Sequence, residues 1–176
     1  DIYHFDNTMM TNSEIYSGMK NRFLPSAYLE WGLPLFNPTG TWTQIIEPRA
    51  RITFMRHNDN EDVALNNDSA GTILTDSTLF SDNRFAGLDV WENGTYSDYG
   101  VRWAAFNKSG KTFELFLGQS YDFKDRPSVD LNSGFYNGSS DYVGRVSYNN
   151  AKWFNVASRF RMNKNDFGLS HIETSA

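Results

Sequence analysis

The sequence of 176 residues predicts an all-β protein, an antiparallel meander of about seven to eight strands. Apolar and polar residues alternate one by one over several stretches, which is the pattern of strands with two different faces. Several stretches also reach the roughly 9 to 11 residues that cross a bilayer at a tilt, whereas an ordinary strand has about 5 to 6. The length of these stretches therefore favours the strands of a transmembrane β-barrel.

Composition and charge exclude several other classes. The formal net charge is -5 and the sequence contains no basic cluster, which argues against a nucleic-acid partner. The absence of cysteine excludes disulfides and thiolate metal sites within this sequence. Apolar residues are dispersed, so no run approaches the roughly 20 residues of a spanning helix. Dispersed apolar residues are compatible with membrane strands, because only every second residue of such a strand meets lipid.

The first clear strand runs from Ala27 to Leu35. Ala27, Leu29, Trp31, Leu33 and Leu35 share one face, and Pro34 fits the end of a strand better than its centre. Residues 37–40 are then expected to form a turn. In the preceding 23 residues, only Ile2–Phe5 suggests a short strand, and the remainder is expected to be polar loop.

The next strand, from Trp42 to about Arg56, has one apolar and one charged face. The apolar face holds Trp42, Ile46, Ala50, Ile52 and Phe54, and the other holds Thr43, Glu47, Arg49, Arg51 and Thr53. In a soluble sandwich the charged face would meet water, whereas in a barrel with a wet lumen it would face inward and the apolar face would meet lipid. Alternation alone leaves both arrangements open, and the length of the strand favours the barrel.

The clearest hairpin joins Tyr99–Asn107 to Thr112–Phe123 through a turn at 107–111. With the preceding strand it supplies the predicted lipid-facing residues, which are Ala50, Ile52, Phe54, Val101, Trp103, Phe113, Leu115 and Leu117. Three further strands are expected at about 142–149, 154–162 and 167–174.

The connections differ at the two ends of the predicted sheet. Stretches 57–96 and 125–140 are long and polar, whereas the turns at 107–111 and 149–152 are short and lie at the opposite end. Outer-membrane barrels have long extracellular loops and short periplasmic turns, so we expect both long stretches to be extracellular. The short turn at 163–166 falls at the long-loop end and weakens this argument.

No pattern of catalytic or metal-binding residues is present. The three histidines are His4, His57 and His171, and they show no metal-ligand spacing. Ser170 precedes His171 without a Gly-x-Ser-x-Gly frame. The acidic run Asp59–Asp62 lacks the glycine and the final glutamate of a calcium loop. We therefore expect no catalytic residue, no metal and no cofactor.

Several short sequence motifs resemble those of one known family. They are DSTLF at Asp76–Phe80, NRFAGLD at Asn83–Asp89, YGVR at Tyr99–Arg102, LGQSY at Leu117–Tyr121, WTQIIEPRARITF at Trp42–Phe54 and FLP at Phe23–Pro25. In this order they resemble the LptD family, the lipopolysaccharide-assembly proteins of the bacterial outer membrane. The resemblance covers most of the chain from about residue 20 onward.

The resemblance implies a fold, a function and partners. It implies that residues 1–176 are a fragment of one C-terminal barrel domain, incomplete at both ends and integral to the bacterial cell outer membrane. The function it implies is the transport and assembly of lipopolysaccharide into the outer leaflet, without enzyme activity. The implied partners are lipopolysaccharide, an LptE-like lipoprotein and a periplasmic lipopolysaccharide-bridge protein. The sequence departs from those family members that carry disulfides, because it has no cysteine.

Six arginines on the predicted polar face are the candidate contacts to lipopolysaccharide. They are Arg49, Arg51, Arg102, Arg145, Arg159 and Arg161. Guanidinium groups suit phosphate and carboxylate groups because they donate paired hydrogen bonds. In the alternative interpretation, these arginines pair with acidic residues of the same face, which are Glu30, Glu47, Glu114 and Asp122.

A general diffusion porin or a small outer-membrane barrel enzyme would use the same strand pattern. A lipopolysaccharide translocon of the LptD type requires a periplasmic jellyroll domain before its barrel, whereas a porin has none. The complete reading frame would therefore separate these two interpretations.

Overall fold

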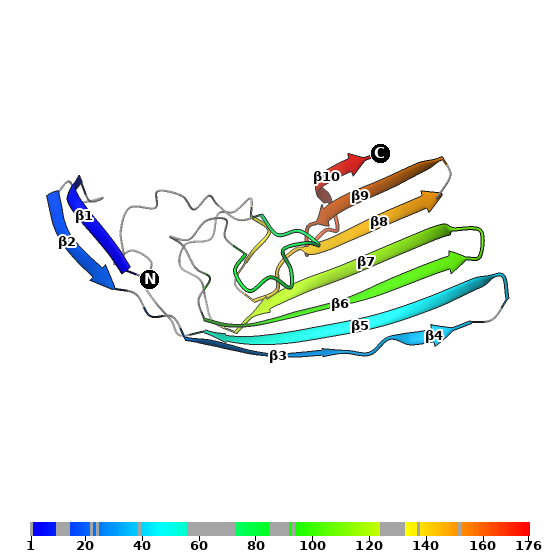
Figure 1. Cartoon of the computed structure of the whole chain (residues 1–176), viewed down its shortest axis with the longest axis horizontal. Helices are drawn as coiled ribbons and strands as arrows, with labels where there is room; N and C mark the ends of the chain where they lie inside the picture. Colours follow the sequence, from blue (N-terminus) through cyan, green and yellow to red (C-terminus); the bar gives the residue numbers. More distant parts are fainter. Residues whose placement is uncertain are drawn as a thin grey trace.

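The computed structural model describes residues 2–9, 15–21, 23, 25–38, 40–55, 73–84, 92, 94–123, 133–136, 138–150 and 153–176. The regular elements in these ranges are strands, and they form two antiparallel sheets (Figure 1). The smaller sheet pairs β1 (Ile2–Met9) with β2 (Ile15–Asn21).

The larger sheet is an eight-stranded meander. It contains β3 (Ser26–Gly32), β4 (Leu35–Asn37), β5 (Trp42–Met55), β6 (Gly94–Asn107), β7 (Lys111–Asp122), β8 (Tyr142–Asn150), β9 (Phe154–Met162) and β10 (Leu169–Ser175). From β5 to β10 each strand pairs with the next one in sequence, while β3 and β4 both pair with β5. The predicted all-β antiparallel meander is confirmed.

The strands differ from the sequence prediction in three places. The strand expected from Ala27 to Leu35 is divided into β3 and β4, because Pro34 has no amide for the ladder. The amide of Leu33 donates instead to the carbonyl oxygen of Pro48 at 3.2 Å. Part of the predicted N-terminal loop forms β2, and β6 begins at Gly94, inside the stretch 57–96 that was expected to be loop.

The register separates charged from apolar residues. Glu30, Arg51, Asp98 and Ser120 are successive Cα partners across β3, β5, β6 and β7 and therefore lie on one face. We call the face that carries Arg51, Arg102 and Arg145 the charged face, and the face that carries Ile52, Val101 and Leu115 the apolar face. These two faces are those that the alternation in the sequence predicts.

Burial follows the opposite rule from that of a soluble sheet. Residues of the charged face, including Arg51, Asp98 and Ser120, are buried. Residues of the apolar face, including Phe54 and Leu115, are exposed. A soluble sheet buries its apolar face instead, so this sheet has the inverted polarity of a barrel wall.

The connections are divided between the two ends of the sheet as expected. Figure 1 shows the β6–β7 and β8–β9 connections at one end, on the right, and the β5–β6 and β7–β8 connections at the other. The β9–β10 connection lies at the second end, as the sequence also indicated. No helix in the described ranges is long and apolar enough to cross a membrane.

Candidate functional site

A segment between β5 and β6 packs onto the charged face. We call residues 73–84 the strap, and Figure 1 shows them in green near β7 and β8. Leu74 and Leu79 of the strap are buried with Phe116 of β7 and Val143 of β8, and Phe135 from the β7–β8 connection completes this cluster. The hydrophobic core of the described residues therefore lies between the strap and the charged face.

Hydrogen bonds between residues close in sequence fix the shape of the strap. The amide of Thr75 donates to the Thr78 hydroxyl at 3.0 Å, and the amide of Thr78 donates to the Thr75 hydroxyl at 3.2 Å. The amide of Leu79 donates to the carbonyl of Thr75 at 3.1 Å. Threonine hydroxyls thus satisfy backbone groups where no strand or helix does so. This turn places the side chain of Leu79 in the core.

A glycine of β7 provides the space that Leu79 fills. A Cβ atom on Gly118 would overlap Cδ2 of Leu79 and would lie 2.9 Å from Cζ of Phe116. Real Cβ atoms essentially never approach other atoms so closely, so the strap requires glycine at this position.

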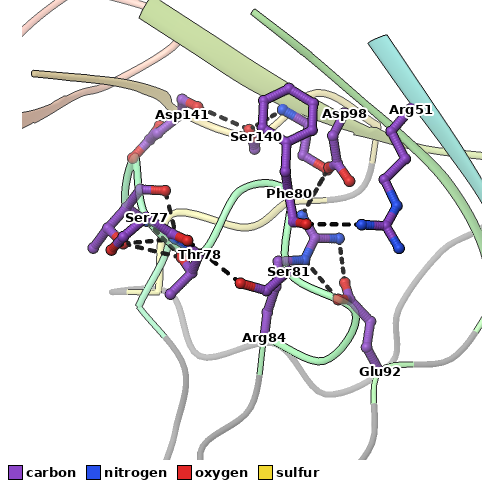
Figure 2. A network of polar contacts seen from close by, with 12 residues as sticks. Arg51, Ser77, Thr78, Phe80, Ser81, Arg84, Glu92, Asp98, Ser140 and Asp141 are labelled. Carbon is purple, nitrogen blue, oxygen red and sulfur yellow. Dashed lines mark hydrogen bonds and ion pairs between the residues drawn. The ribbon is translucent and has the colours of Figure 1, made fainter. Parts of the chain in front are cut away.

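Arg84, the last residue of the strap, is fully buried and bonded on all sides (Figure 2). Its Nε donates to Oε2 of Glu92 at 2.6 Å, and its Nη2 donates to Oε1 of the same carboxylate. Its Nη1 donates to Oδ1 of Asp98 at 3.0 Å and to Oγ of Ser120 at 2.9 Å. Arg84 therefore joins the strap to β6 and β7 through one guanidinium group.

The surroundings of Arg84 favour its charged form. Burial alone would lower the pKa of the guanidinium, but the carboxylates of Glu92 and Asp98 outweigh burial and raise that pKa above its ordinary value. The rings of Tyr96 and Phe135 also face the guanidinium, with centroids 4.4 and 4.7 Å from its central carbon. Such contacts stabilise a desolvated cation.

Arg51 of β5 fastens the middle of the strap. Its Nη1 donates to the carbonyl oxygen of Phe80 at 2.8 Å, and its Nη2 pairs with the carboxylate of Asp82. The ring of Tyr28 lies 3.7 Å from the guanidinium, and only 5% of the Arg51 side chain is exposed. Arg51 is therefore a structural contact rather than an open binding group.

Asp76 connects the strap to β8 and β9. Its buried carboxylate forms ion pairs with Nη1 of Arg145 at 3.6 Å and with Nε of Arg159 at 3.2 Å. Arg145 and Arg159 are direct Cα partners. Like charges in that position repel, so Asp76 compensates a repulsion within the sheet.

Arg161 lies beneath the β7–β8 connection. Its Nη1 donates to the carbonyl of Ser133 at 3.0 Å, and its Nε lies 3.5 Å from Oδ2 of Asp141. Burial raises the pKa of Asp141 above its ordinary value, against the opposing effects of the Lys164 amide and Arg161. Gly134 has a φ of 85°, and a Cβ there would lie 2.7 Å from Cδ of Arg161. Arg161 is thus enclosed.

The remaining two predicted arginines pair with glutamates of the strands. Arg49 pairs with Glu30, and Arg102 binds Oε2 of Glu114 at 2.7 Å through its Nη2. The other oxygen of Glu114 accepts a bond from Arg145, and Glu47 lies 3.5 Å from Arg102. Glu30, Glu47 and Glu114 therefore pair with arginines of the same face, as the alternative interpretation of the sequence expects.

The six predicted arginines share the charged face but differ in accessibility. Arg51 and Arg161 are covered, whereas Arg49, Arg102, Arg145 and Arg159 keep between a third and nearly half of their side chains exposed. Sequence reasoning missed a seventh arginine, Arg84, together with its partners. The family motifs could have pointed to these residues, because Asp76 belongs to DSTLF and Arg84 belongs to NRFAGLD.

The eight predicted lipid-facing residues lie together on the apolar face. The register pairs Val101 with Leu117 and Trp103 with Leu115, and the rings of Trp103 and Phe113 lie 5.4 Å apart. Contact of these residues with lipid is a prediction.

The structure describes only some of the other sequence candidates. In the described part of the chain, no group of three or more His, Asp or Glu residues could hold a metal. The hydroxyl of Ser170 accepts a bond from Nε of Arg161 at 3.1 Å and donates to the Arg161 carbonyl at 3.2 Å. The run Asp59–Asp62 and His57 lie outside the described residues.

An antiparallel meander of long strands with an exposed apolar face and a covered charged face has the architecture of a transmembrane β-barrel wall. The chain belongs to the LptD family, because the family model described as "LptD: LPS transport system D" matches residues 1–176. LptD is an integral outer-membrane protein, and the sheet is therefore a section of such a barrel.

Similar proteins include LPS-assembly proteins LptD from three pseudomonads. The protein of Pseudomonas entomophila strain L48 is 33% identical over 125 residues, which cover 65% of this chain and 13% of that protein. The protein of Pseudomonas putida strain GB-1 is 32% identical over 126 residues, which cover 69% of this chain and 13% of that protein. The protein of Pseudomonas aeruginosa strain LESB58 is 30% identical over 124 residues, covering 68% and 13%. The chain thus matches about an eighth of the length of these relatives.

Proposed function

We propose that the protein containing this chain transports lipopolysaccharide and assembles it into the outer leaflet of the bacterial outer membrane. One observation carries the proposal beyond family membership. The words DSTLF and NRFAGLD, by which the sequence resembles the family, contribute Asp76, Leu79 and Arg84 to the buried network on the charged face. These two family motifs therefore help to shape the charged face, which we propose to be the barrel interior.

In this proposal the charged face lines the lumen. Arg49, Arg102, Arg145 and Arg159 are exposed there and would meet phosphate and carboxylate groups of lipopolysaccharide, since guanidinium groups bind such groups with paired hydrogen bonds. Arg51 and Arg161 would instead hold the strap and the β7–β8 connection in place.

The apolar face would meet the lipid of the outer membrane. The stretches 57–96 and 125–140 would lie at the extracellular end, although the strap within the first of them folds back against the sheet. An LptE-like lipoprotein and a periplasmic lipopolysaccharide-bridge protein would be the protein partners.

Depletion of the full-length protein tests this function against that of a porin. We expect newly made lipopolysaccharide to accumulate in the inner membrane and periplasm, while the uptake of small solutes does not fall. Loss of a porin would lower that uptake and leave lipopolysaccharide export unchanged. Membrane fractionation with a solute-uptake assay distinguishes the two results.

A further inference from the structure

We propose that Arg159, positioned by Asp76, receives a phosphate group of the transported glycolipid on the charged face. This inference rests on the proposed function and extends it, because it names a binding residue, a positioning residue and the chemical group that is bound.

Arg159 has a free guanidinium edge. Its Nε lies 3.2 Å from Oδ1 of Asp76, while its two terminal nitrogens make no hydrogen bond or ion pair with any other described residue. Its side chain is 45% exposed, the largest fraction among the predicted arginines. The donors opposite Asp76 are therefore available to a ligand.

The other exposed arginines differ from Arg159 in this respect. Nη1 and Nη2 of Arg145 face Asp76 and Glu114, and those of Arg102 face Glu47 and Glu114. Arg49 pairs with Glu30, and its guanidinium lies over the ring of Phe80, 4.5 Å from the centroid. Their terminal donors are thus partly or fully engaged.

The local charge favours an added anion. Asp76 is shared between Arg145 and Arg159, which are direct Cα partners on neighbouring strands. Glu173, the Cα partner of Arg159 on β10, forms no ion pair with it in this structure. Arg145 and Arg159 therefore share the single negative charge of Asp76. A second anion bound at Arg159 would reduce the repulsion between the two arginines.

The geometry of the free edge selects the ligand class. Two coplanar N–H donors match two oxygens of a phosphate, and the charge strengthens both bonds. A neutral sugar hydroxyl gains much less from the same edge. The free edge therefore favours an anionic group of the glycolipid over a neutral hydroxyl, and a dephosphorylated probe tests whether that group is the phosphate.

The test measures binding of lipopolysaccharide to the purified full-length protein in detergent. Two probes are compared, intact lipopolysaccharide and the same preparation after phosphatase treatment. The variants are Arg159→Gln, Arg159→Lys and Asp76→Asn, and Lys111→Gln removes a charge at the β6–β7 turn as a matched control. Heat-modifiability on a gel shows that each variant retains its folded barrel.

Arg159→Gln should weaken binding of the intact probe by about tenfold and leave the dephosphorylated probe unaffected. Asp76→Asn should weaken the same preference by a smaller factor, and Arg159→Lys should retain part of it. Equal losses for both probes, or none for the intact probe, would overturn the inference, whereas failure of the unaltered protein to bind either probe would overturn the proposed function itself.

Discussion

The guanidinium of Arg84 and the carboxylate of Asp98 lie 3.0 Å apart, Nη1 to Oδ1, and both side chains are fully buried. This pair links a segment without regular structure to the middle of the wall. Because the pair is removed from water, the loss of Arg84 would leave the buried carboxylates of Asp98 and Glu92 without their cation. The strap is thereby fixed to β6.

Replacing Arg84 should destabilise the protein severely. Arg84→Met keeps much of the side-chain volume but leaves Glu92 and Asp98 buried without their cation, at an expected cost of about 3 to 5 kcal/mol. Arg49→Met is the matched control on the same face, and loss of its exposed pair with Glu30 should cost no more than about 1 kcal/mol. Denaturant unfolding of the full-length protein in detergent measures both, and similar costs would contradict the structural role of Arg84.

Gly118 and Leu79 should be coupled. Gly118→Ala places a methyl group against Leu79 and should cost about 1 to 3 kcal/mol through overpacking. Adding Leu79→Ala should cost less in that variant than alone, because the shortened side chain makes room for the methyl group. Gly32→Ala is the control, since its nearest neighbour, Cγ of Arg49, lies at 3.4 Å. Additive free energies in the double variant would show that the strap does not occupy this position.

The two faces should tolerate charge differently. Leu115→Arg places a cation on the apolar face near the middle of β7 and should cost about 2 to 4 kcal/mol in a bilayer. Ser147→Arg adds the same group to the charged face on the adjacent strand, beside Glu114, and should be tolerated. Heat-modifiability of the full-length protein in membranes compares the two variants. Equal tolerance would reverse or remove the assignment of the faces.

The two ends of the sheet should be accessible from different compartments. A short epitope tag at Asn67, in the long stretch between β5 and β6, should be labelled by antibody on intact cells. The same tag at Ser109, in the β6–β7 turn, should be labelled only after the outer membrane is permeabilised. The opposite pattern would invert the topology.

Strand faces were predictable because they are encoded locally. A period of two fixes which side chains share a face once a strand forms, so the positions of Arg51 and Ile52 on opposite faces follow from adjacent sequence. The eight residues expected to face lipid were placed on one face for the same reason. Which face is covered is a property of the environment, and the exposed Leu115 and buried Asp98 supplied that answer.

The strap could not be predicted from periodicity. Its position depends on contacts between residues far apart in sequence, such as Arg51 with Asp82 and Asp76 with Arg159. No local pattern distinguishes a polar segment that folds back from one that remains in solvent. The sequence also does not show which arginines the strap covers. Arg51 and Arg159 are therefore equivalent candidates by sequence, although only Arg159 is exposed in the structure.

The measurement that tests the account most directly is surface labelling of newly made lipopolysaccharide after depletion of the full-length protein. We predict that labelling falls sharply and returns when the unaltered gene is restored. Uptake of small solutes should not fall during depletion. Normal surface labelling of new lipopolysaccharide after depletion would contradict the proposed transport function.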